Sequence, residues 1–211
     1  MTDEARSTKD RILDAAEALL GERGPGETSL RDITAAAGVN LAAVNYHFQS
    51  KDHLLRAVVD RRIVPLNLRR LELLDTAEAA AGKRGPGLTK VLEAFLFPPL
   101  DLIVTAPQFV PLMGRIYTEP QFIEELIRKH MLPFKDRLLA ALRHACPSLS
   151  DEAIVWRIHF ALGAMTHAMA GSHLIRLSSG GRCDPADLET TKRQLIAFLV
   201  AGFHAPEPKE S

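Results

Sequence analysis

The sequence predicts an all-α fold in two parts, a short N-terminal segment of three helices and a larger helical part after it, about nine helices in all. Apolar residues recur three and four positions apart along most of the chain, which is the spacing of one helix face. No stretch alternates apolar and polar residues as a half-buried strand does, and no Asn-Gly or Asp-Gly hairpin turn occurs. With 46% hydrophobic residues among 211, the chain can fill a core between such helices.

The N-terminal helices are predicted from their caps and breaks. A first helix over residues 9–24 is expected to bury an apolar stripe and to expose its charged residues, Glu17 included. Ser29 is the candidate N-cap of a second, short helix, and Gly38 is the candidate left-handed residue that ends it. A third short helix is expected at residues 40–47. Three helices with a glycine turn between the second and the third have the layout of a helix-turn-helix.

The rest of the chain is predicted as long helices separated by short loops. Ser50 is the candidate cap of a longer helix that begins at Lys51 and continues over residues 66–81, with Pro65 as a candidate bend. Further helices are expected at residues 88–104, 107–117, 120–146, 150–177 and 185–203. Prolines at positions 98, 99, 107, 111, 120 and 133 are expected to interrupt them, because proline removes a helical hydrogen bond. We place a helix-turn-helix DNA-binding domain at residues 1–55 and a larger domain at residues 56–211.

Composition limits the classes of partner. Lysine plus arginine equals aspartate plus glutamate at 26 each, so the chain lacks the bulk positive charge of a protein that coats nucleic acid or membranes. Its two cysteines, Cys146 and Cys183, form no CxxC pair, which is typical of a reducing compartment. Neither a signal peptide nor an apolar run long enough to cross a bilayer is visible. We therefore expect a cytoplasmic protein with no membrane partner.

The most informative segment is residues 28–55, TSLRDITAAAGVNLAAVNYHFQSKDHLL. Its features are the Thr-Ser start, the Ala-Ala-Ala-Gly-Val turn, the run Tyr46-His47-Phe48, and Lys51 three positions later. This combination resembles the TetR family of bacterial repressors over roughly the first 60 residues. The resemblance implies a regulator that binds a palindromic operator in double-stranded DNA as a homodimer and is released by a small apolar effector. Catalytic residues and a cofactor are not expected.

Side-chain chemistry in this segment agrees with DNA binding. A recognition helix enters a major groove about 12 Å wide, so small side chains suit its exposed face. Asn45 can form paired hydrogen bonds with an adenine edge, and Arg31 can reach a guanine. The resemblance implies that the base-contacting residues are Arg31, Leu41, Ala42, Ala43 and Asn45. It implies that the residues holding the DNA backbone are Thr28, Tyr46, His47 and Lys51.

Each of these residues also has a structural interpretation. Phe48 is interpreted as a core aromatic, and Tyr46 can be one as well. His47 can be a structural histidine, although its place in the Tyr-His-Phe run favours a phosphate contact. The alanines have the best helix propensity and can be present for that reason alone. The sequence leaves these alternatives open.

Charge in the N-terminal segment favours a dimer. Up to Arg62 there are ten acidic and nine basic residues, so one copy can neutralise few phosphates and two half-sites must be engaged together. The last two predicted helices are the candidate dimer surface, shared with the core. The first of them carries small residues at Ala161, Gly163, Ala164, Ala168 and Gly171. The second carries an apolar stripe at Leu188, Leu195, Ile196, Leu199 and Phe203.

The middle helices are rich in large apolar side chains, and helices that proline interrupts often leave a cavity between them. An effector pocket is expected there, although most of these residues, taken singly, can belong to a plain core. The candidate ligand-binding residues are Phe95, Phe109, Met113, Arg115, Trp156, His159 and Phe160. The runs at 39–48, 65–67, 71–75 and 114–120 resemble the fatty-acid-responsive PsrA-type regulators. That resemblance implies a long-chain fatty acid or acyl-CoA as the effector, with Arg115 or His159 at the end of an apolar channel.

Two other functions remain for the helical part, a small enzyme and a carrier of an apolar ligand. The sequence holds no glycine-rich phosphate loop, no GxSxG elbow and no close pair of nucleophile and base, which disfavours the enzyme. A carrier would leave the phosphate-contacting residues without a role. A metal site is not expected, because the histidines and cysteines have neither HExxH nor Cys/His ligand spacing.

Overall fold

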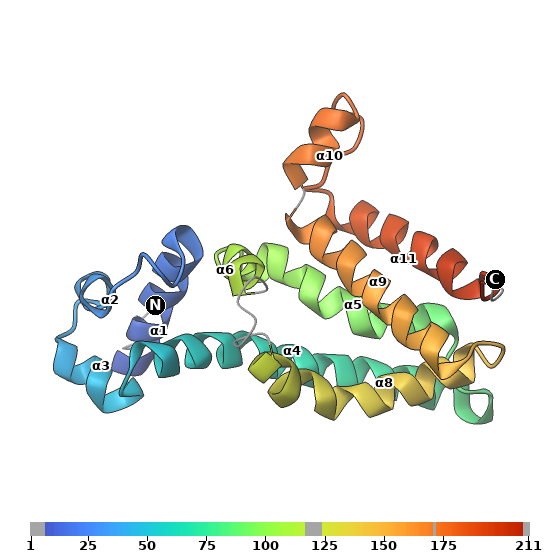
Figure 1. Ribbon diagram of the computed structural model, residues 1–211, viewed down its shortest axis with the longest axis horizontal. Coiled ribbons are helices and arrows are strands. Elements are labelled where there is room, and N and C mark those ends of the chain that lie inside the picture. The colour runs from blue at the N-terminus through green and yellow to red at the C-terminus, as the bar shows by residue number, and fades with distance from the viewer. Residues whose placement is uncertain (1–6, 117–123, 171, 209–211) are drawn as a thin grey trace, which may run out of the picture. The chain divides into compact units, whose positions relative to one another are not determined.

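The computed structural model describes residues 7–116, 124–170 and 172–208 (Figure 1). Within these ranges every regular element is helical, which confirms the predicted all-α fold. The elements up to residue 116 are α1 (Thr8–Arg23), α2 (Leu30–Ala37), α3 (Leu41–Phe48), α4 (Lys51–Ala81), η1 (Gly82–Arg84), α5 (Leu88–Thr105) and α6 (Phe109–Ile116). Those that follow are η2 (Ile127–Met131), α8 (Leu132–Ala145), α9 (Asp151–Ala170), α10 (Ser172–Ser178) and α11 (Leu188–His204).

The chain folds as two compact units, and the first, unit 1, combines two separate segments, Met1–Pro65 and Ala106–Ile123. In unit 1, α1 contacts α2, α3 and α6. α6 is a short helix that buries Phe109, Leu112 and Ile116. The boundary predicted between residues 55 and 56 falls inside α4, and the compact units change at residue 65. The assignment of separate functions to residues 1–55 and 56–211 stays a prediction.

Local sequence explains the short helices of unit 1. The Ser29 hydroxyl oxygen accepts the Asp32 N–H at 3.2 Å while the Asp32 carboxylate accepts the Ser29 N–H at 2.9 Å, which is a capping box. Gly38 follows α2 with φ 63° and ψ 39°, the left-handed conformation that glycine adopts without Cβ strain. Asn40 caps α3, because its side-chain oxygen accepts the Ala43 N–H at 2.9 Å. The predicted roles of Ser29 and Gly38 are confirmed.

The connection between α3 and α4 is a γ-turn centred on Gln49. Gln49 has φ 65° and ψ −41°, and the Ser50 N–H donates to the Phe48 carbonyl at 2.7 Å. A residue other than glycine at positive φ is uncommon, and this turn type is strained. Ser50 then caps α4, since its hydroxyl oxygen accepts the His53 N–H at 3.2 Å. Only Gln49 and Ser50 therefore separate the two helices.

The second unit, unit 2, comprises Leu66–Thr105 and Glu124–Ser211 and is built around one apolar core. α5 is its central helix, since it contacts α8, α9 and α11 (Figure 1). Phe95 and Leu100 of α5 are among the most completely buried side chains. The core continues into the neighbouring helices through Phe134, Leu142, Ile154, Ile196 and Leu199. Apolar burial is therefore the main interaction that packs these helices together.

Prolines interrupt the helices less than the sequence predicts. α5 continues through Pro98 and Pro99. α4 continues through Pro65, as the sequence predicts. Each proline removes one backbone hydrogen bond, but Pro98 and Pro99 are buried in α5, so apolar contacts offset the loss. Pro133 lies at the start of α8, where the missing N–H would have no helical partner. The remaining positions are Pro107 before α6, Pro111 in the first turn of α6, and Pro120 outside the described residues.

The helix expected over residues 150–177 is helical in its described parts, α9 and α10, which flank residue 171 outside the described ranges. One predicted helix boundary is wrong. The helix expected from residue 185 begins at Leu188, because the Asp187 carboxylate accepts the Thr190 N–H at 2.9 Å and so caps α11. The described part of the helix expected over 120–146 contains the π-helical turn η2 before α8. Such turns depend on tertiary packing, which apolar periodicity does not report.

Glu17 is buried rather than on the solvent face of α1, with only 4% of the residue exposed. Its carboxylate accepts hydrogen bonds from Arg61 at 2.6 Å and from Arg62 at 2.8 Å, both on α4. Arg61 also donates to Asp14 at 2.7 Å. A carboxylate is tolerated in the interior when it is paired and hydrogen-bonded. The partners lie more than forty residues away in the sequence, so the periodicity of α1 could not reveal them.

Candidate nucleic-acid interface

α3 is anchored by one face and exposes the other. Val44 and Phe48 are buried and hold the helix against the core of unit 1. Ala42 and Asn45 are exposed, and Tyr46 is 84% exposed. The outward face therefore combines a small side chain and an amide with one exposed tyrosine, and a helix of this kind can enter a major groove.

The other candidate base-contacting residues lie on the same two helices. Leu41 is exposed at the first position of α3, and Ala43 is half-buried further along the same turn. Arg31 is exposed in the first turn of α2, which packs against α3. The structure thus brings the five candidate base-contacting residues to α2 and α3 and leaves none of them buried.

Thr28 differs from the rest of the candidate set, because it is only 1% exposed. Its hydroxyl donates to the Gly24 carbonyl at 2.8 Å and lies 3.2 Å from the Leu19 carbonyl. A hydroxyl has one proton, and both neighbours are acceptors, so this group fixes the loop between α1 and α2. A DNA contact through this hydroxyl would require it to leave these carbonyls.

The remaining candidate phosphate-contacting residues have two kinds of environment. The Lys51 ammonium, at the start of α4, donates to the Pro25 carbonyl and so ties α4 to the loop after α1. Tyr46 and His47 are exposed, with their rings edge to face and 5.0 Å between centroids. Lys51 therefore has a structural role already, whereas Tyr46 and His47 have surfaces available for a partner.

Arg11 is a positioning residue that the sequence analysis did not single out. Its guanidinium donates from Nη2 to the Ala37 carbonyl at 2.7 Å and to the Gly38 carbonyl at 2.9 Å. A cation at the C-terminus of a helix satisfies its last carbonyls and the helix dipole. Arg11 thereby holds the turn between α2 and α3 from α1. No local signal marks it, because its partners are 26 and 27 residues away.

Three of the candidate ligand-binding residues lie in unit 1, on α6. Phe109 is fully buried and Met113 is half-buried. Arg115 donates from Nη2 to the Glu22 carbonyl at 2.9 Å, near the end of α1. The arginine therefore attaches α6 to α1, in addition to any contact it makes with a ligand.

Phe95 lies in the core of unit 2 beside a buried arginine. Its ring stacks on Phe134 with 6.0 Å between centroids. The guanidinium of Arg70 lies 4.8 Å from the Phe95 ring centroid and 5.5 Å from that of Phe134, and its Nε donates to the Phe95 carbonyl at 2.9 Å. This cation is held by aromatic faces and a backbone oxygen, an arrangement that needs a planar guanidinium.

The last three candidate ligand-binding residues, Trp156, His159 and Phe160, are exposed on α9. The rings of Trp156 and Phe160 stack with 5.8 Å between centroids. The structure therefore divides the seven candidates among α6, the core of unit 2 and the surface of α9. Their assignment to an effector site stays a prediction.

The candidate dimer residues belong largely to the core of unit 2. On α11 the buried residues are Leu195, Ile196, Leu199 and Phe203, and on α9 Ala161 is buried as well. Gly163 is exposed, and Gly171 lies outside the described residues. The apolar stripe of α11 is used to pack on α5 and α9, so it is not available to a partner. The large apolar side chains that stay exposed on these two helices are Val155, Trp156, Phe160 and Phe198.

Other chemistries find little support in the described ranges. No helix there combines the length and the apolar character of a membrane span. Over the same residues, histidine, cysteine and acidic side chains nowhere gather in threes as metal ligands. Burial raises the pKa of the Cys146 thiol above its ordinary 9.0, which favours the unreactive protonated form.

The helices α1 to α3, with a glycine turn between α2 and α3 and an exposed face on α3, have the arrangement of a helix-turn-helix DNA-binding regulator. Comparison with known proteins leads to the same class. Residues 12–58 match the family described as bacterial regulatory proteins, tetR family, and residues 93–202 match the tetracyclin repressor-like C-terminal domain. The chain belongs to the TetR family of DNA-binding transcriptional regulators, as the motif at residues 28–55 predicts.

Relatives and solved structures agree with this assignment. The transcriptional regulator AcrR of Shigella flexneri is 32% identical over 147 residues, which cover 67% of this chain and 65% of that protein. SmeT, the repressor of the Stenotrophomonas maltophilia multidrug efflux pump SmeDEF, has a TM-score of 0.64 at 22% identity and covers 98% of this chain and 97% of its own. A SmeT–triclosan complex has a TM-score of 0.63 at 20% identity, with 98% and 100% covered. The structural likenesses establish the fold.

Proposed function

We propose that this regulator is a repressor that binds a palindromic operator as a homodimer and is released by a small apolar effector. The observation that carries the proposal is the outward face of α3. Val44 and Phe48 hold the helix from beneath, and Ala42, Asn45 and Tyr46 face solvent. A helix supported in this way can enter the major groove without rearranging its own core.

The proposed contacts divide into base reading and backbone holding. Asn45 pairs with an adenine edge, Arg31 reaches a guanine, and Leu41 contacts a thymine methyl group. Tyr46 and His47 hold phosphates beside them. Thr28 is proposed to support these contacts by ordering the loop before α2, since its hydroxyl is bonded to the Gly24 carbonyl.

The proposed dimer uses the exposed apolar face of α9 and α11. Trp156 and Phe160 on α9 and Phe198 on α11 are exposed, Phe198 to 70%, and the two helices pack on each other. Aromatic side chains exposed together on neighbouring helices are typical of a protein interface. Two copies related by a twofold axis would cover this face in a four-helix bundle and would present two recognition helices to a palindrome.

The dimer surface is tested by Phe198→Glu, with Val104→Glu as the control. Both positions are exposed apolar sites of unit 2, but Val104 lies on α5, outside the proposed interface. A carboxylate buried in an apolar interface is strongly unfavourable. We expect sedimentation to show monomers for Phe198→Glu and dimers for Val104→Glu. A dimeric Phe198→Glu protein would place the interface elsewhere.

The effector is proposed to be apolar, with long-chain fatty acids and acyl-CoA esters as the first class to test. The PsrA-type resemblance of residues 39–48 and 114–120 supports the acyl class. SmeT, which shares the fold, forms a complex with triclosan, so a small molecule is an appropriate kind of effector to seek. Calorimetry with C12–C18 acids and their CoA esters measures whether the protein binds them. Absence of binding would exclude acyl compounds as the effector.

Release is proposed to follow a change in the spacing of the two recognition helices. In the DNA-bound dimer they would lie about 34–36 Å apart, one turn of DNA. An effector that tilts α4 would alter that spacing, provided that it binds the non-DNA form more tightly. Cross-links that fix the spacing should abolish induction. Release of DNA from a cross-linked dimer would contradict this mechanism.

The decisive experiment selects genomic DNA fragments on the purified protein at physiological salt, with and without an acyl-CoA. A shared palindrome that the acyl-CoA releases is the expected result. A palindrome indifferent to the acyl-CoA would keep the DNA-binding proposal and remove the acyl effector. Failure to enrich any site would contradict the proposed operator binding.

A further inference from the structure

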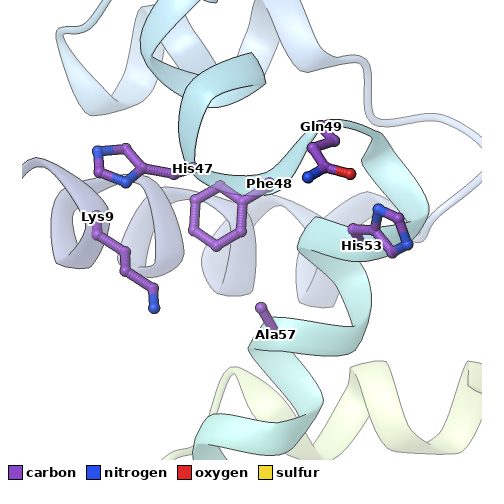
Figure 2. Close-up of a pocket in the computed structure, with 6 residues that line it drawn as sticks. All are labelled: Lys9, His47, Phe48, Gln49, His53 and Ala57. Atoms are coloured by element: carbon purple, nitrogen blue, oxygen red, sulfur yellow. The ribbon is translucent and has the colours of Figure 1, made fainter.

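A hollow of about 390 Å³ lies beside the recognition helix and is lined by residues from three helices and a turn. Lys9 comes from α1, His47 and Phe48 from α3, Gln49 from the γ-turn, and His53 and Ala57 from α4. Figure 2 shows Lys9 and His47 on one side of the Phe48 ring and Gln49 and His53 on the other. Apart from His47, none of these residues belongs to the predicted DNA-contacting set.

The lining of this hollow has the chemistry of an anion site. Four of its six residues carry side-chain N–H groups, Lys9, His47, Gln49 and His53, and none of the six is acidic. His53 is in the first turn of α4, a helix of 31 residues whose N-terminal end carries a positive partial charge. The nearest acids in sequence are Asp10, whose carboxylate accepts the Ser7 hydroxyl at 2.5 Å, and Asp52; neither lines the hollow.

The shape of the hollow follows from the γ-turn. Phe48 is buried and forms its floor, while the hydrogen bond from Ser50 N–H to the Phe48 carbonyl fixes Gln49 at the rim. Lys9, His47, Gln49 and His53 are exposed. Strained backbone at positive φ persists where the surrounding structure holds it, and it is common at binding sites. The donors are therefore presented to solvent from a rigid frame.

We propose that this hollow holds one phosphodiester of the operator backbone, so that Lys9 and His53 are DNA-contacting residues. His47 connects the hollow to the recognition helix, because it precedes Phe48 and follows the exposed Tyr46. A phosphate held there flanks the groove that α3 enters and fixes the register of the helix on the duplex. This inference rests on the proposed operator binding and adds a contact from α1 and one from α4.

The test compares Lys9→Gln and His53→Ala with the control Arg23→Gln in full-length protein bound to the selected operator. Arg23 is an exposed cation on α1, as Lys9 is, but at the opposite end of the helix. Removing one cation that binds a phosphate should lower the slope of log K against log salt by about 1. The dimer carries two copies of each residue, so we expect Lys9→Gln to reduce the slope by about two units, one per subunit, and Arg23→Gln to keep the wild-type slope. His53→Ala removes one hydrogen bond per subunit and should bind the operator roughly four- to hundredfold more weakly.

A second measurement identifies the phosphate. The affinities of wild-type protein and of Lys9→Gln are measured for a set of operators, each carrying a neutral methylphosphonate at one position per half-site. At one position per half-site, the substitution should weaken wild type but have little further effect on Lys9→Gln, since the charge pair is already broken. Far-ultraviolet circular dichroism checks that each variant keeps its helices.

The outcomes separate this inference from the proposed function. If wild type binds the operator, and Lys9→Gln and His53→Ala match it in affinity and salt slope, the hollow holds no phosphate and operator binding stands. If Lys9→Gln and Arg23→Gln reduce the slope equally, the effect is general charge and the inference is wrong. If wild type binds no operator, the proposed function fails, and this inference fails with it.

Discussion

Each of the two units of this regulator has an apolar core, but the polar interactions that supplement it differ. In unit 1, side chains on α1 bond across to other elements, as Glu17 does to Arg61 and Arg62 and Arg11 does to the Ala37 and Gly38 carbonyls at the end of α2. In unit 2, a continuous apolar core joins α5 to α8, α9 and α11. Hydrogen bonds and ion pairs are directional, whereas apolar burial is not. Directional interactions suit a unit that must present α3 at a fixed angle, and an apolar core suits one proposed to adapt to a ligand.

The largest expected effect is in the apolar unit, for Phe95→Ala. Phe95 is buried in the centre of α5 and stacks on Phe134. Truncating a buried phenylalanine costs about 3–5 kcal/mol in the free energy of unfolding, and here it also removes the aromatic face over Arg70. Hydrogen exchange should show the loss of protection mainly in unit 2. Val104→Ala on the same helix, at an exposed site, should change stability by less than about 0.5 kcal/mol.

A Phe95→Ala protein that loses protection equally in both units would show that they unfold together. The units would then differ in the interactions that pack them, but they would not unfold independently of each other.

The next effect is in unit 1, for Glu17→Ala. The carboxylate is buried, and its removal leaves two arginine side chains without their buried acceptor. We expect the free energy of unfolding to fall by about 2–4 kcal/mol. This is toward the lower end of the range for breaking a buried ion pair, because the two arginines are partly exposed. Asp14→Ala is the matched control, because Asp14 also pairs with Arg61 at 2.7 Å but is much more exposed. It should lose less than about 1 kcal/mol.

Protection from exchange is the measurement, and for Glu17→Ala the loss should be concentrated in α1 and the N-terminal half of α4. Equal effects of Glu17→Ala and Asp14→Ala would mean that the buried carboxylate has no special role, and that unit 1 depends on its apolar residues as unit 2 does.

The smallest effect concerns acid stability and the capping box of α2. Hydrogen bonds from the Ser29 hydroxyl and the Ser29 N–H lower the pKa of Asp32 below its ordinary 3.8. A lowered pKa stabilises the folded state above the unfolded pKa, and this contribution is lost as the pH falls through the folded value. Asp32→Asn should therefore be less stable than wild type near neutral pH, and the difference should shrink below pH 3.8.

Asp187→Asn makes the same change in unit 2, because Asp187 caps α11 and hydrogen bonds from Thr190 lower its pKa. Measured by hydrogen exchange at several pH values, Asp32→Asn should affect α2 and Asp187→Asn should affect α11. A difference from wild type that is constant with pH would show that the charge of the cap is unimportant.

What the sequence predicts well is what neighbouring residues determine. Ser29, Asp32 and Gly38 form caps within one turn of the ends of α2, so the limits of that helix were predictable from local chemistry. The family was predictable from residues 28–55, because the recognition helix and its supports are contiguous. The exposure of Asn45 and the burial of Val44 follow from the same short segment.

What the sequence misses depends on distant partners. Glu17 has the spacing of a solvent-facing residue, yet Arg61 and Arg62 draw it into the interior. Leu195 and Leu199 form a stripe whose periodicity is the same whether it packs on α5 or on a second copy. Lys9 on α1 and His53 on α4 line the same hollow beside α3, although they lie far apart in the sequence and neither is part of a recognisable motif. Periodicity identifies a buried face but not the neighbour that buries it.

Because α6 belongs to unit 1, the order of synthesis affects how that unit folds. The helices α1 to α3 leave the ribosome first, but α6, which covers part of α1, follows only after Leu66–Thr105 has been made. Residues 66–105 form a long connection between the two segments of unit 1, but a longer connection adds little to the free-energy cost of bringing its ends together. The expected consequence is therefore that unit 1 completes its folding later, not that it is less stable. Because α6 lies outside residues 1–65, a graft of those residues onto another protein would leave open the face of α1 that α6 covers.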